Sequence, residues 1–93
     1  MRTRFVLMKE ISKTHLDSRQ LLVFVTLART VNMSRAAEEL HMTTSGVSHC
    51  LKTLEADLGC RLFERSSRKF EVSAVGLEFL PEAEQLLDRM KVV

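Results

Sequence analysis

Residues that strands and turns depend on are scarce in this 93-residue sequence, which has three glycines, one proline, five phenylalanines and neither tryptophan nor tyrosine. With so few turn formers, an all-β fold is disfavoured and long helices are expected. No stretch approaches the roughly 20 apolar residues of a membrane-spanning helix. The apolar run at 5–8 is too short for the core of a signal peptide. We therefore expect a cytoplasmic protein with no membrane partner.

Patterns typical of metal sites and catalytic sites are missing too. Cys50 and Cys60 have no zinc or redox spacing, and the three histidines do not group with them. We interpret both cysteines as free thiols in a reducing compartment. No glycine-rich loop and no nucleophile–base spacing is present. The sequence predicts neither an enzyme nor a bound metal or cofactor.

The charge of the chain is small overall but unevenly distributed. The net charge is +2, yet residues 1–16 carry four basic side chains against one acidic, and residues 74–93 carry two against four. Residues 61–69 form a further basic cluster, which suggests two faces with different partners. The length allows one small domain that is only marginally stable alone, and a dimer would stabilise it.

The first clear helix signal lies at Asp17. Asp17 and Gln20 have the spacing of a capping box, and Leu16 and Leu21 that of a hydrophobic staple, which predicts a helix from residue 18 to about 30. Its apolar residues cover more than one stripe, so other elements should cover it on two sides.

Two short helices are predicted next, joined by a tight turn. Ser34 is expected to cap the first, over residues 35–41, and Thr43 to cap the second, which Gly59 ends. The second helix spans about residues 44–58 and has an apolar stripe for the core. Its opposite face is polar and begins with short side chains: Thr44, Ser45, Ser48, His49 and Lys52.

A small β-hairpin with a basic tip is predicted at 61–72, followed by a helix that Ser73 caps and that reaches at least Met90. The apolar stripe of this last helix would suit an intramolecular core. A domain this small has little core left to offer it, however, so we favour pairing with a second chain. The predicted dimer-interface residues are Phe79, Ala83, Leu86, Leu87 and Met90.

Two short helices with a polar face on the second have the geometry of a helix-turn-helix, whose second helix enters the major groove of DNA. Small hydroxyls at its start allow close approach to bases. Gly46 removes a side chain that would hold the helix off the DNA, although a close core contact would explain it equally well. The basic tip, with Arg68 and Lys69, suits a wing on phosphates or in a minor groove. The alternative is that the polar face is simply solvated.

One specific combination of motifs joins these elements: AA-x-x-L, then LE-x-x-LG-x-x-LF-x-R. With it, the sequence resembles the DNA-binding region of LysR-type transcriptional regulators from about Leu16 to Met90. The residues that carry the resemblance are Phe24-Val25, Leu27-Ala28, Ser34-Arg35-Ala36-Ala37-Glu38-Glu39-Leu40, Val47-Ser48, Leu54-Glu55, Leu58-Gly59, Leu62-Phe63-Glu64-Arg65 and Gly76.

The resemblance implies a mostly α winged helix-turn-helix with a small β-hairpin wing and a long C-terminal linker helix that pairs two protomers. It divides the chain into an N-terminal arm or extension (1–16), the winged domain (17–73) and a truncated dimerisation helix (74–93). It implies a dimer on a palindromic promoter site, with the recognition helix, about 44–58, in the major groove and the wing, 66–70, on the backbone or minor groove. The residues expected to contact DNA are Arg35, Thr43, Thr44, Ser45, Ser48, His49, Lys52, Arg65, Arg68 and Lys69.

Several residues depart from the family pattern. Val31-Asn32-Met33 stands where Gly-Ser-Phe is usual, and Thr44-Ser45-Gly46 and Cys50 replace the frequent Gln-Pro-Ala and Gln, so the operator sequence stays open. The family's effector-binding domain needs about 200 further residues. We therefore expect a fragment or a natural short form without an effector site, from a family whose full-length members are often tetramers.

Three alternatives remain open at this point. Arg65 would also suit a surface ion pair with Glu64 or Glu71. Cys50, expected to face outward near the DNA, would serve as an oxidisable switch if its thiol pKa were lowered. The whole chain would also suit a protein-interaction module that pairs through its helices with another chain.

Overall fold

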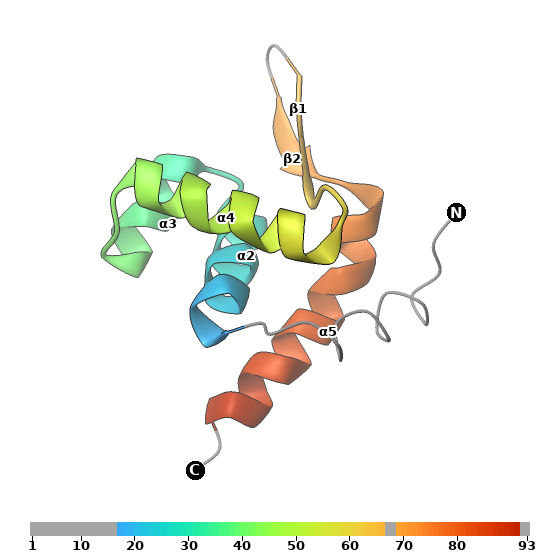
Figure 1. The fold of residues 1–93 in the computed structure, drawn as a ribbon. Helices are drawn as coiled ribbons and strands as arrows, with labels where there is room; N and C mark the ends of the chain where they lie inside the picture. The colour runs from blue at the N-terminus through green and yellow to red at the C-terminus, as the bar shows by residue number, and fades with distance from the viewer. Residues whose placement is uncertain (1–16, 67–68, 92–93) are drawn as a thin grey trace.

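The computed structural model describes residues 17–66 and 69–91, so the predicted arm, the staple residue Leu16 and the wing residue Arg68 lie outside the described part. Figure 1 shows the hairpin standing out from a helical body. The two strands pair antiparallel, with Phe63 opposite Val72 and Arg65 opposite Phe70. The mostly helical winged helix-turn-helix fold is confirmed. The element order is α2 (Ser18–Thr30), α3 (Met33–Leu40), α4 (Thr44–Leu58), β1 (Phe63–Arg65), β2 (Phe70–Val72) and α5 (Ala74–Lys91).

The capping box at the start of α2 is present as predicted. The Gln20 N–H donates to Asp17 Oδ1 at 2.8 Å, and the Asp17 N–H donates to Gln20 Oε1 at 3.2 Å. Gln20 is buried, and its side-chain Nε2 also donates to Asp57 Oδ2 at 3.1 Å. Because Asp57 lies near the end of α4, this cap also ties the start of α2 to the end of the recognition helix.

The capping residue of α3 differs from the predicted one, and the caps of α4 are those predicted. Asn32, and not Ser34, caps α3: its Oδ1 accepts the Arg35 N–H at 2.9 Å, so the helix begins at Met33. Asparagine and serine are equally good capping residues. Asn32 has the extended backbone of a capping residue, so its side chain can reach the N–H of Arg35, three residues later. Thr43 caps α4 and Gly59 ends it in the left-handed region, at φ 73°, as predicted.

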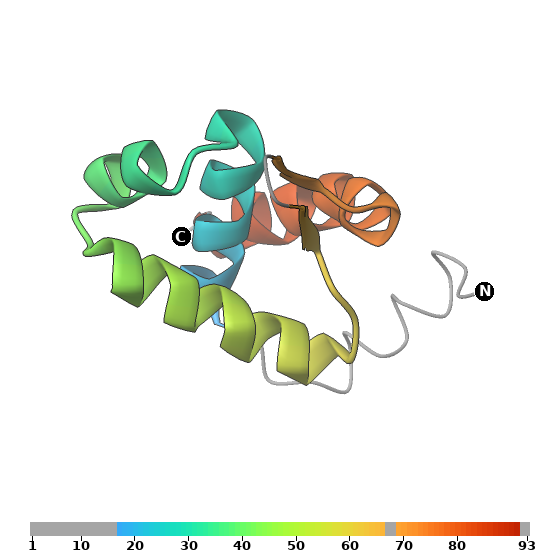
Figure 2. The same cartoon turned by 90° about the horizontal axis from the view of Figure 1, so that it is seen from above.

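The core is built around α2, which packs against α3, α4 and α5, as its broad apolar surface predicts. The Phe24 ring of α2 lies 5.2 Å from the Phe79 ring of α5 and 5.6 Å from the Phe63 ring of β1, centroid to centroid. Viewed from above, α2 runs between α4 on one side and α5 on the other (Figure 2). One aromatic cluster thus joins the helix-turn-helix, the hairpin and the last helix.

The prediction that the stripe of α5 faces a second chain is wrong for most of its residues. Phe79 and Ala83 are fully buried, and Leu87 is 6% exposed, all within the core of the same chain. Leu86 is half-buried against that core, and the side chain of Met90 lies outside the described part. The physical reason is that α2 is apolar on two sides and takes up the stripe of α5, so the domain has more core to offer than its length suggests.

Gly76, in the first turn of α5, marks the closest approach between this helix and the hairpin. A Cβ there would lie 2.3 Å from the Leu62 carbonyl oxygen and 2.6 Å from Val72 Cγ1. The first of these neighbours is backbone, so it cannot rotate away. The glycine therefore sets how closely α5 packs against the base of the wing.

Gly76→Ala is expected to destabilise the domain by about 1–3 kcal/mol through overpacking. In an unobstructed helix the same change would stabilise by about 1 kcal/mol. Whether the free energy of unfolding falls or rises therefore shows whether residue 76 packs closely against Leu62. Chemical denaturation followed by circular dichroism measures it. Glu78→Ala, on the exposed face of the same helix, is the control and should change stability by no more than about 0.5 kcal/mol. A stabilised Gly76→Ala chain would contradict the close approach.

Candidate nucleic-acid interface

The recognition helix α4 presents a polar face outward, as predicted. Its apolar residues Val47, Leu51, Leu54 and Leu58 are buried. Ser48 is half-buried, and the other members of the polar face are exposed. The side chains open to a partner at the start of α4 are therefore mostly hydroxyls, which donate and accept hydrogen bonds without bulk.

The first turn of α4 explains Gly46 without reference to a partner. Thr43 Oγ1 accepts the Gly46 N–H at 3.0 Å and lies 3.3 Å from Ser45 Oγ. A Cβ on residue 46 would lie 3.0 Å from that same Thr43 oxygen and 3.6 Å from Met42 Cε. The glycine thus leaves room for the cap. Thr43, predicted to contact DNA, already uses its hydroxyl within the helix-turn-helix.

The position of the hairpin beside α4 is fixed by side chains at its base. Glu55 Oε2 accepts the N–H groups of Leu62, at 2.6 Å, and of Phe63, at 3.2 Å. Ser73 Oγ donates to the Arg61 carbonyl oxygen at 2.7 Å and accepts the Gly76 N–H at 3.0 Å. Charged acceptors and paired hydroxyls of this kind hold backbone firmly. The wing is therefore tied to both α4 and α5.

The hairpin itself carries stacked rings and cations. The Phe70 ring stacks on the Phe63 ring at 4.9 Å, and the Arg65 guanidinium carbon lies 5.6 Å from the Phe70 ring centroid. In the described part of the chain, Arg65 forms no ion pair with Glu64 or Glu71. The Phe70 ring thus positions the Arg65 guanidinium by a cation–π contact. This contact uses none of the guanidinium N–H groups, so they can still donate hydrogen bonds to a partner. Lys69, at the tip, is exposed.

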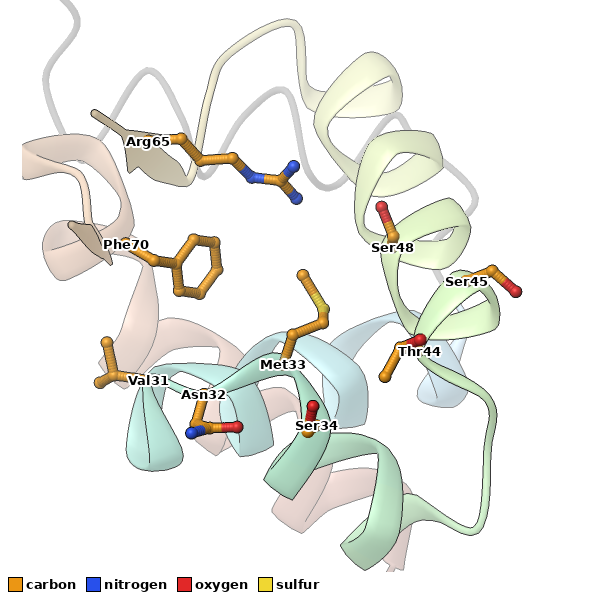
Figure 3. A pocket seen from close by; sticks show the side chains of 9 residues that line it. All are labelled: Val31, Asn32, Met33, Ser34, Thr44, Ser45, Ser48, Arg65 and Phe70. Carbon is orange, nitrogen blue, oxygen red and sulfur yellow. The ribbon is translucent and has the colours of Figure 1, made fainter. Parts of the chain in front are cut away.

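An open cleft of about 560 Å³ separates α4 from the hairpin, and we call it the α4–wing cleft. Figure 3 shows the Arg65 guanidinium reaching across it toward α4, and Ser48 and Thr44 on the opposite side. Met33 lies between the two sides, and Phe70 lies beside Arg65 on the side of the hairpin. Its lining residues are Val31, Asn32, Met33 and Ser34 from the α2–α3 junction, Thr44, Ser45 and Ser48 from α4, and Arg65 and Phe70 from the hairpin.

A smaller hollow of about 80 Å³ continues along α4 toward its C-terminal end. Lys52, Arg61 and Arg65 line it together with Glu55, whose carboxylate is engaged by backbone N–H groups. Three cations against one carboxylate leave this side of α4 positive, which favours a polyanion. Lys52 and Arg65 are predicted site residues, whereas Arg61 is not, although the basic cluster at 61–69 contains it.

The structure brings some predicted site residues together and leaves others apart. Four of them, Thr44, Ser45, Ser48 and Arg65, line the one cleft. Arg35 is exposed on α3 and does not line it, and His49 is exposed on α4. The α2–α3 junction also lines the cleft, and the only sign of it in the sequence is that Val31-Asn32-Met33 departs from the family pattern.

Cys50 does not line the α4–wing cleft, and it does not face fully outward as predicted. Its side chain is half-buried against the core. Burial, and then the negative charge of Asp17, raise the pKa of the Cys50 thiol, with Arg19 acting in the opposite direction. A raised pKa keeps the thiol protonated and unreactive at neutral pH. This direction is opposite to what an oxidisable switch requires.

Two further observations concern only the described residues. None of the helices there combines the length and the hydropathy that a bilayer crossing requires. No group of three or more histidine, cysteine or acidic side chains is gathered there in a way that would hold a metal ion.

The chain is similar to one protein family and to several curated proteins. Residues 18–77 match the family model described as bacterial regulatory helix-turn-helix protein, lysR family. The chain is 40% identical over 73 residues to the HTH-type transcriptional regulator TcbR of Pseudomonas sp. (strain P51), covering 78% of this chain and 25% of that protein. It is 42% identical over 76 residues to the regulator CfxR of Cupriavidus necator, covering 82% and 24%. The chain thus spans about a quarter of the length of these relatives.

Solved structures agree with the curated relatives. A DNA complex of the CbnR DNA-binding domain has a TM-score of 0.75 and 39% identity, covering 81% of this chain and 86% of that one. A complex of the BenM DNA-binding domain with catB site 1 DNA has a TM-score of 0.75 and 29% identity, covering 81% and 84%. Oxidised OxyR of Corynebacterium glutamicum has a TM-score of 0.79 and 36% identity, covering 83% and 24%.

Proposed function

Since this chain belongs to the LysR family of bacterial regulatory helix-turn-helix proteins and carries the family's DNA-binding domain, we propose that it binds promoter DNA sequence-specifically through α4 and the wing. Its relatives are transcriptional regulators, and it is not an enzyme. Two solved relatives of nearly the same length as this domain are DNA complexes, which supports double-stranded DNA as the partner.

The observation that carries the proposal is the α4–wing cleft. In a duplex, each sugar–phosphate strand separates a major groove from the neighbouring minor groove. If α4 enters the major groove and the hairpin reaches the next minor groove, the strand between the two grooves passes between α4 and the hairpin. The cleft lies at that place and has hydroxyls on one side and a guanidinium on the other (Figure 3). A solvated helix face alone does not account for this second wall.

The side chains divide by the chemistry of what they meet. The hydroxyl and imidazole groups of Ser45, Ser48 and His49, near the start of α4, suit base edges, because they donate and accept at short range. Ser45 and His49 are exposed, and Ser48 is half-buried. Lys52, Arg61, Arg65, Lys69 and, at the start of α3, Arg35 suit phosphates. Arg68, which lies outside the described residues, stays a predicted phosphate contact.

We propose that the chain acts as a homodimer, although its interface differs from the predicted stripe. One surface open to a partner is a groove between α2 and α5, lined by Leu22, which is 41% exposed, together with Val25 and Leu87. Arg29, Glu84 and Asp88 also line it, and Arg29 already pairs with Glu39 of α3 at 2.6 Å. In this scheme residues 17–73 read the DNA and residues 74–93 take part in pairing. A promoter-binding protein of bacteria works in the cytoplasm, where we place it.

Selection from a random duplex pool, followed by binding at several salt concentrations, tests the proposal. We expect an interrupted palindrome whose half-sites are spaced by about one helical turn or a multiple of it, because a dimer presents two copies of α4. The logarithm of the affinity should fall steeply and linearly with the logarithm of the salt concentration as phosphate contacts release counterions. Weak binding to every duplex would contradict the proposal and favour a protein-interaction module. An unpaired half-site would contradict the dimer.

A further inference from the structure

Val31, between α2 and α3, has an unusual backbone conformation for its residue type. Its φ is 50° and its ψ 37°, which is the left-handed region, and its N–H donates to the Leu27 carbonyl oxygen at 2.8 Å to end α2. Glycine adopts this conformation freely, whereas a β-branched residue there is a true outlier. The cap needs the conformation, but it does not need the valine.

Among the described residues, no packing in the core compensates for this strain. The Val31 side chain is 43% exposed and belongs neither to the buried core nor to the apolar residues that pack against it. His41 is the other described non-glycine residue with positive φ, at 55°. Histidine is found in the left-handed region far more often than valine. Strained residues of this kind tend to gather at functional sites, so the surroundings of the Val31 side chain are a candidate for such a site.

The methyl groups of Val31 lie at the α4–wing cleft. Figure 3 shows Val31 beneath the Phe70 ring, with Met33 further along the same floor. Asn32 lies beside Val31 in that view, whereas Ser48 and the Arg65 guanidinium lie farther from it. Val31 and Phe70 thus place apolar groups at one end of the cleft, and the hydroxyl groups of α4 lie at the other.

We propose that Val31 is a contact residue for DNA, and that its methyl groups pack against a deoxyribose of the strand in the α4–wing cleft. This inference rests on the proposed function. A DNA strand places an apolar sugar beside each charged phosphate, and the cleft offers both apolar and polar groups. The phosphates meet Arg65 and the hydroxyls, and the sugar between them meets Val31 and Phe70. Binding covers a side chain that is otherwise left in water.

A sugar contact makes a distinctive combination of predictions for Val31→Gly. Glycine removes the strain, so the melting temperature should rise by about 4–8 °C. It also removes the methyl groups, so the affinity for a duplex should fall by about threefold to tenfold. A residue with a purely structural role would not gain stability and lose affinity together.

The experiment uses the full 93-residue chain and a fluorescein-labelled 30-base-pair duplex of mixed sequence, with affinity from anisotropy and stability from thermal unfolding. Val31→Ala keeps a Cβ in the left-handed region but removes the β-branch and its methyl groups, so it should lose affinity much as glycine does, with a smaller rise in melting temperature than glycine. His41→Gly is the matched control, because it relieves left-handed backbone outside the cleft. It should unfold no earlier than the parent chain and bind DNA equally well.

Each remaining outcome overturns the inference. Parent affinity in both Val31 variants would exclude the contact. Loss in Val31→Gly but not in Val31→Ala would assign the effect to a looser α2–α3 junction. Loss that disappears on a duplex made only of G·C pairs would point to a thymine methyl and exclude the sugar, because a sugar contact is independent of sequence. If the parent chain itself fails to bind any duplex, the proposed function fails, which is a distinct result.

Discussion

Ser45→Glu is expected to lower duplex affinity by at least about 100-fold while the domain stays folded. Ser45 is exposed in the first turn of α4 and lines the α4–wing cleft, so a carboxylate there would face the phosphates and the electronegative edges of the bases. The first turn of α4 contains no acidic residue. A glutamate at that end of a helix is favoured by the helix dipole, so the melting temperature should be equal or slightly higher.

Fluorescence anisotropy and thermal unfolding of the same samples separate these two effects. The matched control is Gln85→Glu on the exposed face of α5, which changes the net charge by the same amount away from the cleft. It should reduce affinity only slightly, through the general repulsion of a polyanion. Equal losses in the two variants would mean that overall charge, and not the start of α4, governs binding.

Phe24→Ala is the change expected to cost the most stability, about 3–5 kcal/mol. Phe24 is fully buried, and its ring contacts the rings of Phe79 and Phe63, so its loss opens a cavity where α2, α5 and β1 meet. Domains have a total stability of about 5–15 kcal/mol, and one this small lies near the lower end. The variant should therefore be largely unfolded at 37 °C.

Urea denaturation followed by circular dichroism measures this loss. Leu22→Ala removes a large apolar side chain from the same helix, but at a position that is 41% exposed. It should cost less than about 1 kcal/mol in the monomer. Similar losses for Phe24→Ala and Leu22→Ala would contradict the central role of the aromatic cluster.

The elements that the sequence predicted correctly are those that local interactions determine. The capping box of α2 and the two ends of α4 each depend on residues within four positions of one another, so their spacing is visible in the sequence. The cap of α3 was placed two residues late, because Asn32 and Ser34 are both good capping residues. Only the backbone conformation decides between them.

The features that could not be predicted from the sequence are those that depend on which helices and strands pack against one another. An apolar stripe such as that of α5 looks the same whether it meets α2 of its own chain or another protomer. Phe79 and Ala83 were therefore assigned to the wrong partner. The cleft was missed as a unit because Val31, Ser48 and Arg65 come from three separate segments. Glu55 is part of a recognisable motif, but its role in holding β1 appears only in the structure.

The passage of a DNA strand between α4 and the wing is tested most directly by amide chemical shifts of the ¹⁵N-labelled chain during titration with the selected duplex. The largest changes should fall on Ser34, Ser48 and Phe70, which surround the cleft, while Leu77 and Gln85 on the outer face of α5 change little. Large changes confined to α5, with Ser48 and Phe70 unaffected, would contradict the account.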